Sequence, residues 1–79
     1  MRSTKQSPAL LGARIRKERK LLGITQAELA SLAGCGPIFV HQLEMGKPSV
    51  RLDKVLGVLH VLGLSLTIAN GKPVLRVVD

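Results

Sequence analysis

Two short helical segments joined by a glycine-rich turn constrain the fold of this chain more than any other feature. The first segment, TQAELASLAG, opens at Thr25 with Glu28 three residues later, which is the capping-box pattern of a helix start. The second, GPIFVHQLEMG, has Pro37 where a helix can begin and Gly46 where it can end. The sequence therefore predicts two short helices with a tight turn at residues 34–36.

Further helices are predicted on both sides of this pair. Ser7 and Pro8 suit a helix start, and this first helix is expected to run to about Leu22 and to stop at Gly23. The segment LDKVLGVLHVLG predicts a fourth helix. Helical spacing predicts the inward-facing residues, in chain order: Leu11, Ile15 and Leu22; Leu29, Leu32 and Ala33; Phe39, Val40 and Leu43; Leu52, Val55, Leu56, Leu59 and Leu62.

One charged residue is predicted on an inward face. Arg19 falls on the buried side of the first helix, where an unpaired guanidinium is costly. Glu44 lies beside the apolar stripe of the third helix and is the natural partner for Arg19. We therefore expect an ion pair between these two helices.

Charge and composition restrict the partners of the chain. The sequence has 79 residues, with 12 Lys and Arg against five Asp and Glu, and the basic residues crowd into the first twenty positions. This excess favours a polyanion as partner, although a solvated basic face is the simpler alternative. One domain with a small core is expected, and because 46% of the residues are apolar, part of that surface is expected to close an interface with another subunit.

The chemistry-bearing side chains predict no catalytic, metal or cofactor site. Cys35 is the only cysteine, so disulfides within the chain are excluded and a reducing cytoplasm fits. His60 has no further ligands at metal-site spacing. There is no nucleophile-base set or phosphate loop, so an enzyme is not expected. The most apolar run is too short for a bilayer span, and no membrane association is predicted.

The ordered run Thr25-Gln26-x-Glu28-Leu29-Ala30, followed by Gly34, Val40, Leu43-Glu44 and Gly46, resembles the helix-turn-helix of the phage-repressor-like (XRE, lambda-repressor-like) family. The resemblance covers most of the chain, about residues 11–63. It implies that the second of the two helices lies in the major groove of double-stranded DNA while the first crosses the backbone.

The resemblance assigns roles to positions of this sequence. Base-reading positions are Gly36, Pro37, Ile38, His41 and Gln42, and backbone-contacting positions are Gln26, Lys47 and Arg51. The outward-facing cations of the first helix, Arg16, Lys17 and Lys20, are also predicted to contact the DNA backbone. Gln42 could bond adenine, Ile38 could pack on a thymine methyl group, and His41 could donate to phosphate or guanine. The family usually has Ser, Arg or Gln where this chain has Gly36, Pro37 and Ile38, so readout is expected to depend more on DNA shape and on basic residues.

The last segment, LSLTIANGKPVLRVVD, predicts a β-hairpin around Asn70-Gly71. A two-residue loop there would pair Leu66 with Leu75 and Leu64 with Val77. The free edge of the first strand could pair with a second chain, which predicts a two-fold dimer with an intermolecular sheet. The predicted dimerisation residues are Val58, Val61, Leu64, Leu66, Thr67, Ile68, Val74 and Leu75.

The expected organisation is a disordered basic arm at residues 1–6, a four-helix DNA-binding domain at 7–63 and a β dimerisation element at 64–79. This arrangement resembles the HipB-type antitoxin branch of the family. The resemblance implies a cytoplasmic homodimer that represses a toxin-antitoxin operon at a palindromic operator and also binds a HipA-like kinase toxin. Two alternatives are a protein-binding module that uses the helix-turn-helix only as a scaffold, and a standalone XRE regulator without a toxin.

Overall fold

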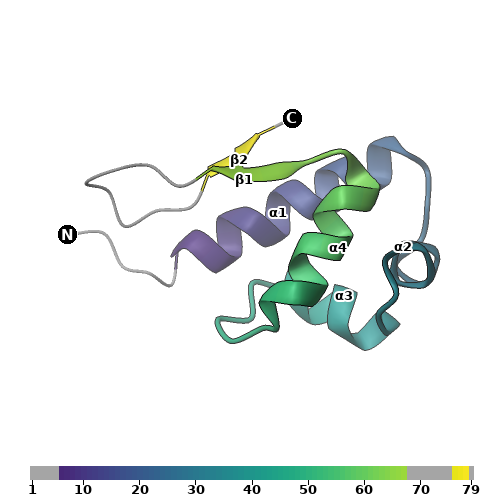
Figure 1. Cartoon of the computed structure of the whole chain (residues 1–79), viewed down its shortest axis with the longest axis horizontal. Helices are drawn as coiled ribbons and strands as arrows, with labels where there is room; N and C mark the ends of the chain where they lie inside the picture. Colours follow the sequence, from purple (N-terminus) through teal and green to yellow (C-terminus); the bar gives the residue numbers. More distant parts are fainter. Residues whose placement is uncertain (1–5, 68–75, 79) are drawn as a thin grey trace.

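The computed structural model describes residues 6–67 and 76–78, which form four helices and two short strands (Figure 1). The helices are α1 (Gln6–Leu21), α2 (Gln26–Ala33), α3 (Pro37–Glu44) and α4 (Leu52–Leu62), and the strands are β1 (Ser65–Thr67) and β2 (Arg76–Val78). The prediction of a mainly helical fold with a C-terminal β element is confirmed. The predicted arm at residues 1–6 falls on undescribed residues except for Gln6, which begins α1.

Local interactions fix the ends of α2 as the sequence predicts. The backbone N–H of Glu28 donates to Thr25 Oγ1 at 3.0 Å, and the Thr25 N–H donates to Glu28 Oε1 at 2.9 Å, which completes the capping box. Gly34 ends the helix with a φ of +73°, a conformation that side-chain-bearing residues rarely adopt. These caps set the short turn from which α3 starts at Pro37.

The core lies where α4 packs across the other helices, and Figure 1 shows α4 in front of α1. All four helices and Leu64, two residues after the end of α4, contribute to one apolar cluster: Leu11, Ile15, Leu29, Ala30, Val40, Leu43, Val55, Val58, Leu59, Leu62 and Leu64. At the α1–α3 crossing, Gly12 lies against the backbone carbonyl groups of Leu43 and Glu44, which leaves no room for a side chain. Helix α3 is therefore held directly against α1.

Several predictions of the inward faces are wrong. Leu22 is 57% exposed because α1 ends at Leu21, so the turn carries Leu22 away from the core. Leu32 is 66% exposed because α2 instead buries Leu29 and Ala30.

The predicted face of α4 is confirmed at Val55, Leu59 and Leu62 and is wrong at three other positions. Leu52 and Leu56 are exposed, whereas Val58, expected at a dimer interface, is fully buried within the chain. The buried positions of α4 are Val55, Val58, Leu59 and Leu62, a regular spacing of three and four residues that places Val58 in the core. Val61 is half-buried against the same cluster.

The β-strands pair in a different register from the predicted one. They are antiparallel, with Leu66 opposite Val77 rather than Leu75, and Ser65 opposite Val78. A shift of two residues leaves each side chain on the same face of the sheet, so the apolar pattern does not distinguish these registers. The Asn70-Gly71 turn that was expected to set the register lies outside the described residues.

Candidate nucleic-acid interface

The outer face of α3 is an exposed surface with mixed chemistry. Ile38 and Met45 are about three-quarters exposed, His41 and Pro37 are exposed, and Gln42 is half-buried. On the opposite side of the helix, Phe39, Val40 and Leu43 pack into the core. The helix is therefore anchored by one face and presents the other outward, as predicted.

A buried ion pair fixes the end of α3 to α1. Arg19 Nε donates to Glu44 Oε2 at 2.6 Å and Arg19 Nη2 donates to Glu44 Oε1 at 3.0 Å, while Arg19 Nη1 donates to the carbonyl of Ile24 at 2.9 Å. The two side chains are 11% and 2% exposed. The structure thus brings together the two residues that the sequence analysis paired. All three guanidinium nitrogens of Arg19 are engaged inside the protein, so its role is structural.

The surroundings of Glu44 stabilise its ionised form. Burial raises the pKa of the carboxyl group, but hydrogen bonds from Arg19 and Gln26 and the charges of Arg19 and Arg16 outweigh it, so the pKa lies below its ordinary value. The hydrogen bond to Glu44 likewise raises the pKa of Arg19 against the opposing effect of burial. Both groups are charged at neutral pH, as an ion pair at this helix crossing requires.

Gln26 makes a contact that the sequence analysis did not predict. Its side-chain Nε2 donates to Glu44 Oε1 at 3.1 Å, which ties the first residue of α2 to the Arg19–Glu44 pair. The residue as a whole is half-buried. No spacing rule links positions 26 and 44. The sequence analysis named Gln26 only because it matches a phosphate-contacting position of the family.

A shallow pocket lies where these three helices meet. It has a volume of about 190 Å³ and is lined by Arg16, Arg19, Gln26, His41, Glu44 and Met45. Arg16 is exposed, whereas the charge of Arg19 is matched by Glu44. The pocket therefore has one exposed guanidinium beside the N-terminal turn of α2, a combination that favours an anion such as a phosphate group.

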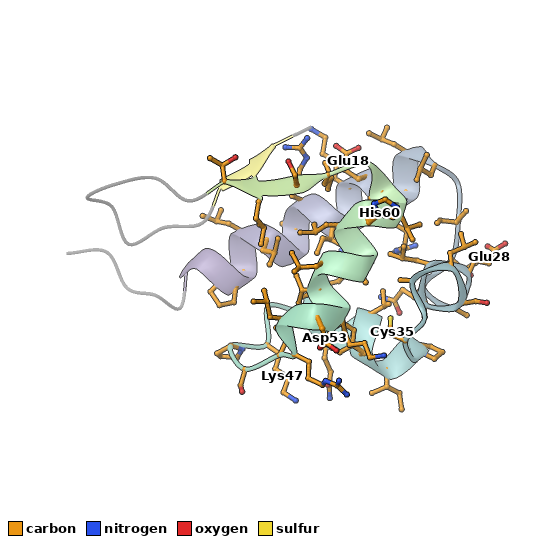
Figure 2. The ribbon with its side chains drawn as sticks, viewed as in Figure 1. Glu18, Glu28, Cys35, Lys47, Asp53 and His60 are labelled. Carbon is orange, nitrogen blue, oxygen red and sulfur yellow. The ribbon has the colours of Figure 1, made fainter. Side chains whose placement is uncertain are left out.

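Further cations are exposed on α1 and in the loop after α3. Lys17 and Lys20 are exposed on α1, and Lys47 and Arg51 are exposed in the loop after α3. Lys47 Nζ lies 3.4 Å from Gln42 Oε1, and Arg51 pairs with Asp53 at 2.8 Å on the surface. Figure 2 labels Lys47 in this loop and Asp53 in the first turn of α4. Arg51 therefore has a carboxylate competing with any phosphate, which Lys47 does not have.

The remaining predicted residues lie away from this surface or inside the protein. Burial raises the pKa of the half-buried Cys35 thiol against the opposing charge of Lys54, which keeps the thiol neutral. Among the predicted dimerisation residues, Leu64 is buried, Leu66 is half-buried and Thr67 is exposed. Ile68, Val74 and Leu75 lie outside the described residues.

A second missed interaction stabilises the turn before α3. Lys54 Nζ donates to the Gly34 carbonyl at 2.9 Å and so connects α4 to the α2–α3 turn.

Within residues 6–67 and 76–78, no helix has the length and apolarity needed to cross a membrane, and no group of three acidic, His or Cys side chains is placed to hold a metal ion.

The sequence was compared with known proteins. Residues 15–68 match the Helix-turn-helix family HTH_3, a stretch that begins in α1 and ends after β1. The chain is also 46% identical over 63 residues to y4mF of Sinorhizobium fredii (strain NBRC 101917 / NGR234), described as an uncharacterized HTH-type transcriptional regulator. That similarity covers 80% of this chain and 83% of the relative.

Proposed function

Because the chain belongs to the XRE-type helix-turn-helix family of DNA-binding transcriptional regulators, we propose that it represses transcription as a two-fold dimer on a palindromic operator. The family is not enzymatic, in agreement with the expectation from the sequence. In the proposed complex, α3 lies in the major groove and α2 crosses the sugar-phosphate backbone. The protein would act in the cytoplasm, where a single free cysteine is chemically stable.

The observation that carries this proposal is the surface formed by α3 and the pocket beside it. His41 and Gln42 lie on the outer face of α3 and would contact base edges. Gly36, Pro37 and Ile38 lie at the start of α3, which would enter the major groove. Arg16 and Gln26 line the pocket beside that face and would take backbone phosphates. The exposed cations Lys17, Lys20, Lys47 and Arg51 would add further phosphate contacts.

We further propose that the C-terminal β element closes the dimer and that the protein is the antitoxin of a HipA-like kinase toxin. The dimer is supported by the two-stranded sheet, because such short isolated strands gain stability from further strands. The toxin role is supported only by the resemblance of this tail to HipB-type regulators. A standalone regulator would use the same DNA-binding surface.

One observation favours a second candidate, a protein-binding module. Ile38 and Met45 give α3 more exposed apolar surface than a purely polar readout needs. In that reading, the partner would be an apolar protein groove and the basic residues would only keep the chain soluble. The two candidates differ in salt dependence, because only phosphate contacts release counterions.

The test is a fluorescence-anisotropy titration of the purified protein with DNA from upstream of its own gene and with a scrambled duplex, at two salt concentrations. We expect selective binding that weakens steeply with added salt. Gln42→Ala should reduce the preference for the operator, and Arg16→Ala should weaken binding to both duplexes. Arg14→Ala is the matched control, because Arg14 lies on the same helix but pairs with Glu18 at 2.9 Å.

Equal and weak binding to both duplexes, unchanged by Gln42→Ala, would contradict operator reading and favour the protein-binding module. An Arg14→Ala loss as large as that of Arg16→Ala would contradict the phosphate pocket. In that case only the overall charge of the chain would matter for its affinity.

A further inference from the structure

The first turn of α3 has no side chain that can form a hydrogen bond with a base. Gly36 has no side chain, and Pro37 has an apolar ring and no N–H group. Ile38 follows and is 74% exposed. Polar groups begin one turn later, at His41 and Gln42. In helix-turn-helix proteins the first residues of this helix contact base edges, so in this chain that contact must be largely apolar.

The core of the protein does not require an apolar side chain at position 38. The apolar face of α3 is complete without it, because Val40 and Leu43 are buried and Phe39 packs against the same core. An added Cβ at Gly36, just before the helix, would meet nothing within 4 Å, so the surface at the start of α3 is open. Most of the Ile38 side chain is thus exposed to solvent, outside the core of the protein.

The chemistry of the groove identifies the partner of such a side chain. B-DNA presents hydrogen-bonding groups along the floor of its major groove and one apolar group, the C5 methyl of thymine. Arg16 lines the same pocket as His41, and Lys47 Nζ lies 3.4 Å from Gln42 Oε1, so cations beside the outer face of α3 favour a polyanion there. A large aliphatic side chain within such a surface matches a methyl group on a base.

We infer that Ile38 is a specificity-determining residue that reads the C5 methyl group of a pyrimidine in each half-site. The inference rests on the proposed operator binding and adds the chemical group that is recognised. Thymine supplies this methyl group in unmodified DNA, and 5-methylcytosine supplies the same group in methylated DNA. Burying the methyl group against Ile38 removes apolar surface from water, a gain of about fourfold in affinity per half-site.

The test starts from the duplex that the full chain binds most tightly in a selection from a randomised library. Each thymine is replaced in turn by deoxyuridine, symmetrically in both half-sites, which removes only the methyl group. We expect one position at which this replacement weakens binding about 15-fold, the product of two half-sites. When that thymine–adenine base pair is replaced by a cytosine–guanine base pair, the duplex with 5-methylcytosine should bind the protein more tightly than the duplex with unmethylated cytosine.

Ile38→Ala should abolish both differences while preserving the fold, because the side chain is exposed. Leu32→Ala is the matched control: it removes a similarly exposed aliphatic side chain from α2, outside the pocket and the outer face of α3, and should leave both differences intact. Wild-type affinity that is insensitive to every uracil and to 5-methylcytosine would overturn the inference, as would a full methyl effect in Ile38→Ala. If no selected duplex binds better than a scrambled one, the proposed function fails first.

Discussion

At the residue scale, the candidate nucleic-acid interface depends on a buried charge cluster. Arg19 and Glu44 are buried, and Gln26 adds a third hydrogen-bonding side chain from α2. The pairing of Arg19 with Glu44 could be predicted because both residues fall on apolar faces of separate helices, where charges need partners. The hydrogen bond from Gln26 to Glu44 could not be predicted, because a glutamine at the start of a helix can equally well be exposed to solvent.

Acid should weaken this cluster. The pKa of Glu44 is below its ordinary value of 4.5 in the folded chain, so the unfolded chain binds the proton first as pH falls. The stabilisation by Glu44 is therefore complete above about pH 4.5 and is lost as pH falls through the folded pKa. Glu44→Gln should lower the free energy of unfolding by about 3 kcal/mol at pH 6, with a smaller difference at pH 3.

Urea denaturation at a series of pH values measures this difference. Glu18→Gln is the control, because Glu18 forms a surface pair with Arg14 and its loss should cost less than about 1 kcal/mol. A gap between wild type and Glu44→Gln that stays constant down to pH 3 would mean that Glu44 does not titrate with folding.

Gly12 should tolerate no side chain. A Cβ there would lie 2.7 Å from the carbonyl oxygen of Glu44 and closer still to that of Leu43, both backbone atoms of α3. Gly12→Ala should therefore force α1 and α3 apart and lower the free energy of unfolding by about 1–3 kcal/mol, despite the higher helix propensity of Ala. Thermal unfolding followed by circular dichroism measures the loss, and Gly36→Ala, which meets nothing within 4 Å, is the control. An equally stable Gly12→Ala would show that the helices separate without cost.

At the element scale, the ends of the helices could be predicted better than their faces. Thr25, Gly34 and Pro37 act through local backbone chemistry, so their patterns determined where α2 and α3 begin and end. The buried face of α4 depends instead on which neighbours surround it. Because its sequence is apolar around most of the helix, Leu52 and Leu56 fitted an inward stripe as well as Val58 did.

Substitutions in α4 should separate the two possible faces. Val58→Ala should lower the free energy of unfolding by about 1–3 kcal/mol, because Val58 is fully buried and its truncation leaves a cavity. Leu56→Ala should change it by about 0.5 kcal/mol or less, since nearly half of that side chain is exposed. Urea denaturation of both variants at low protein concentration is the measurement. A loss for Leu56→Ala that equals the loss for Val58→Ala would indicate that a second chain covers this face.

At the scale of the whole molecule, the proposed dimer would present two copies of the α3 surface to a palindrome. The extents of the single chain, 36 × 22 × 20 Å, are comparable with one helical turn of DNA, about 34 Å. The family and the position of α3 could be predicted from the ordered helix-turn-helix motif. The bases read by α3 could not, because Gly36, Pro37 and Ile38 depart from the polar residues that usually occupy these positions.

A dimer with a fixed distance between its two α3 helices should be sensitive to half-site spacing. Inserting about five base pairs between the half-sites rotates one of them to the opposite face of the duplex, so the second α3 helix loses its groove. We expect the affinity to fall at least about tenfold, towards that of a single half-site. The same base pairs added outside the half-sites are the control and should leave the affinity unchanged. Anisotropy titrations give the affinities, and analytical ultracentrifugation gives the stoichiometry. Two chains per palindrome with a spacing-dependent affinity are expected, whereas one chain per duplex with no dependence on spacing would mean that each chain reads a half-site alone.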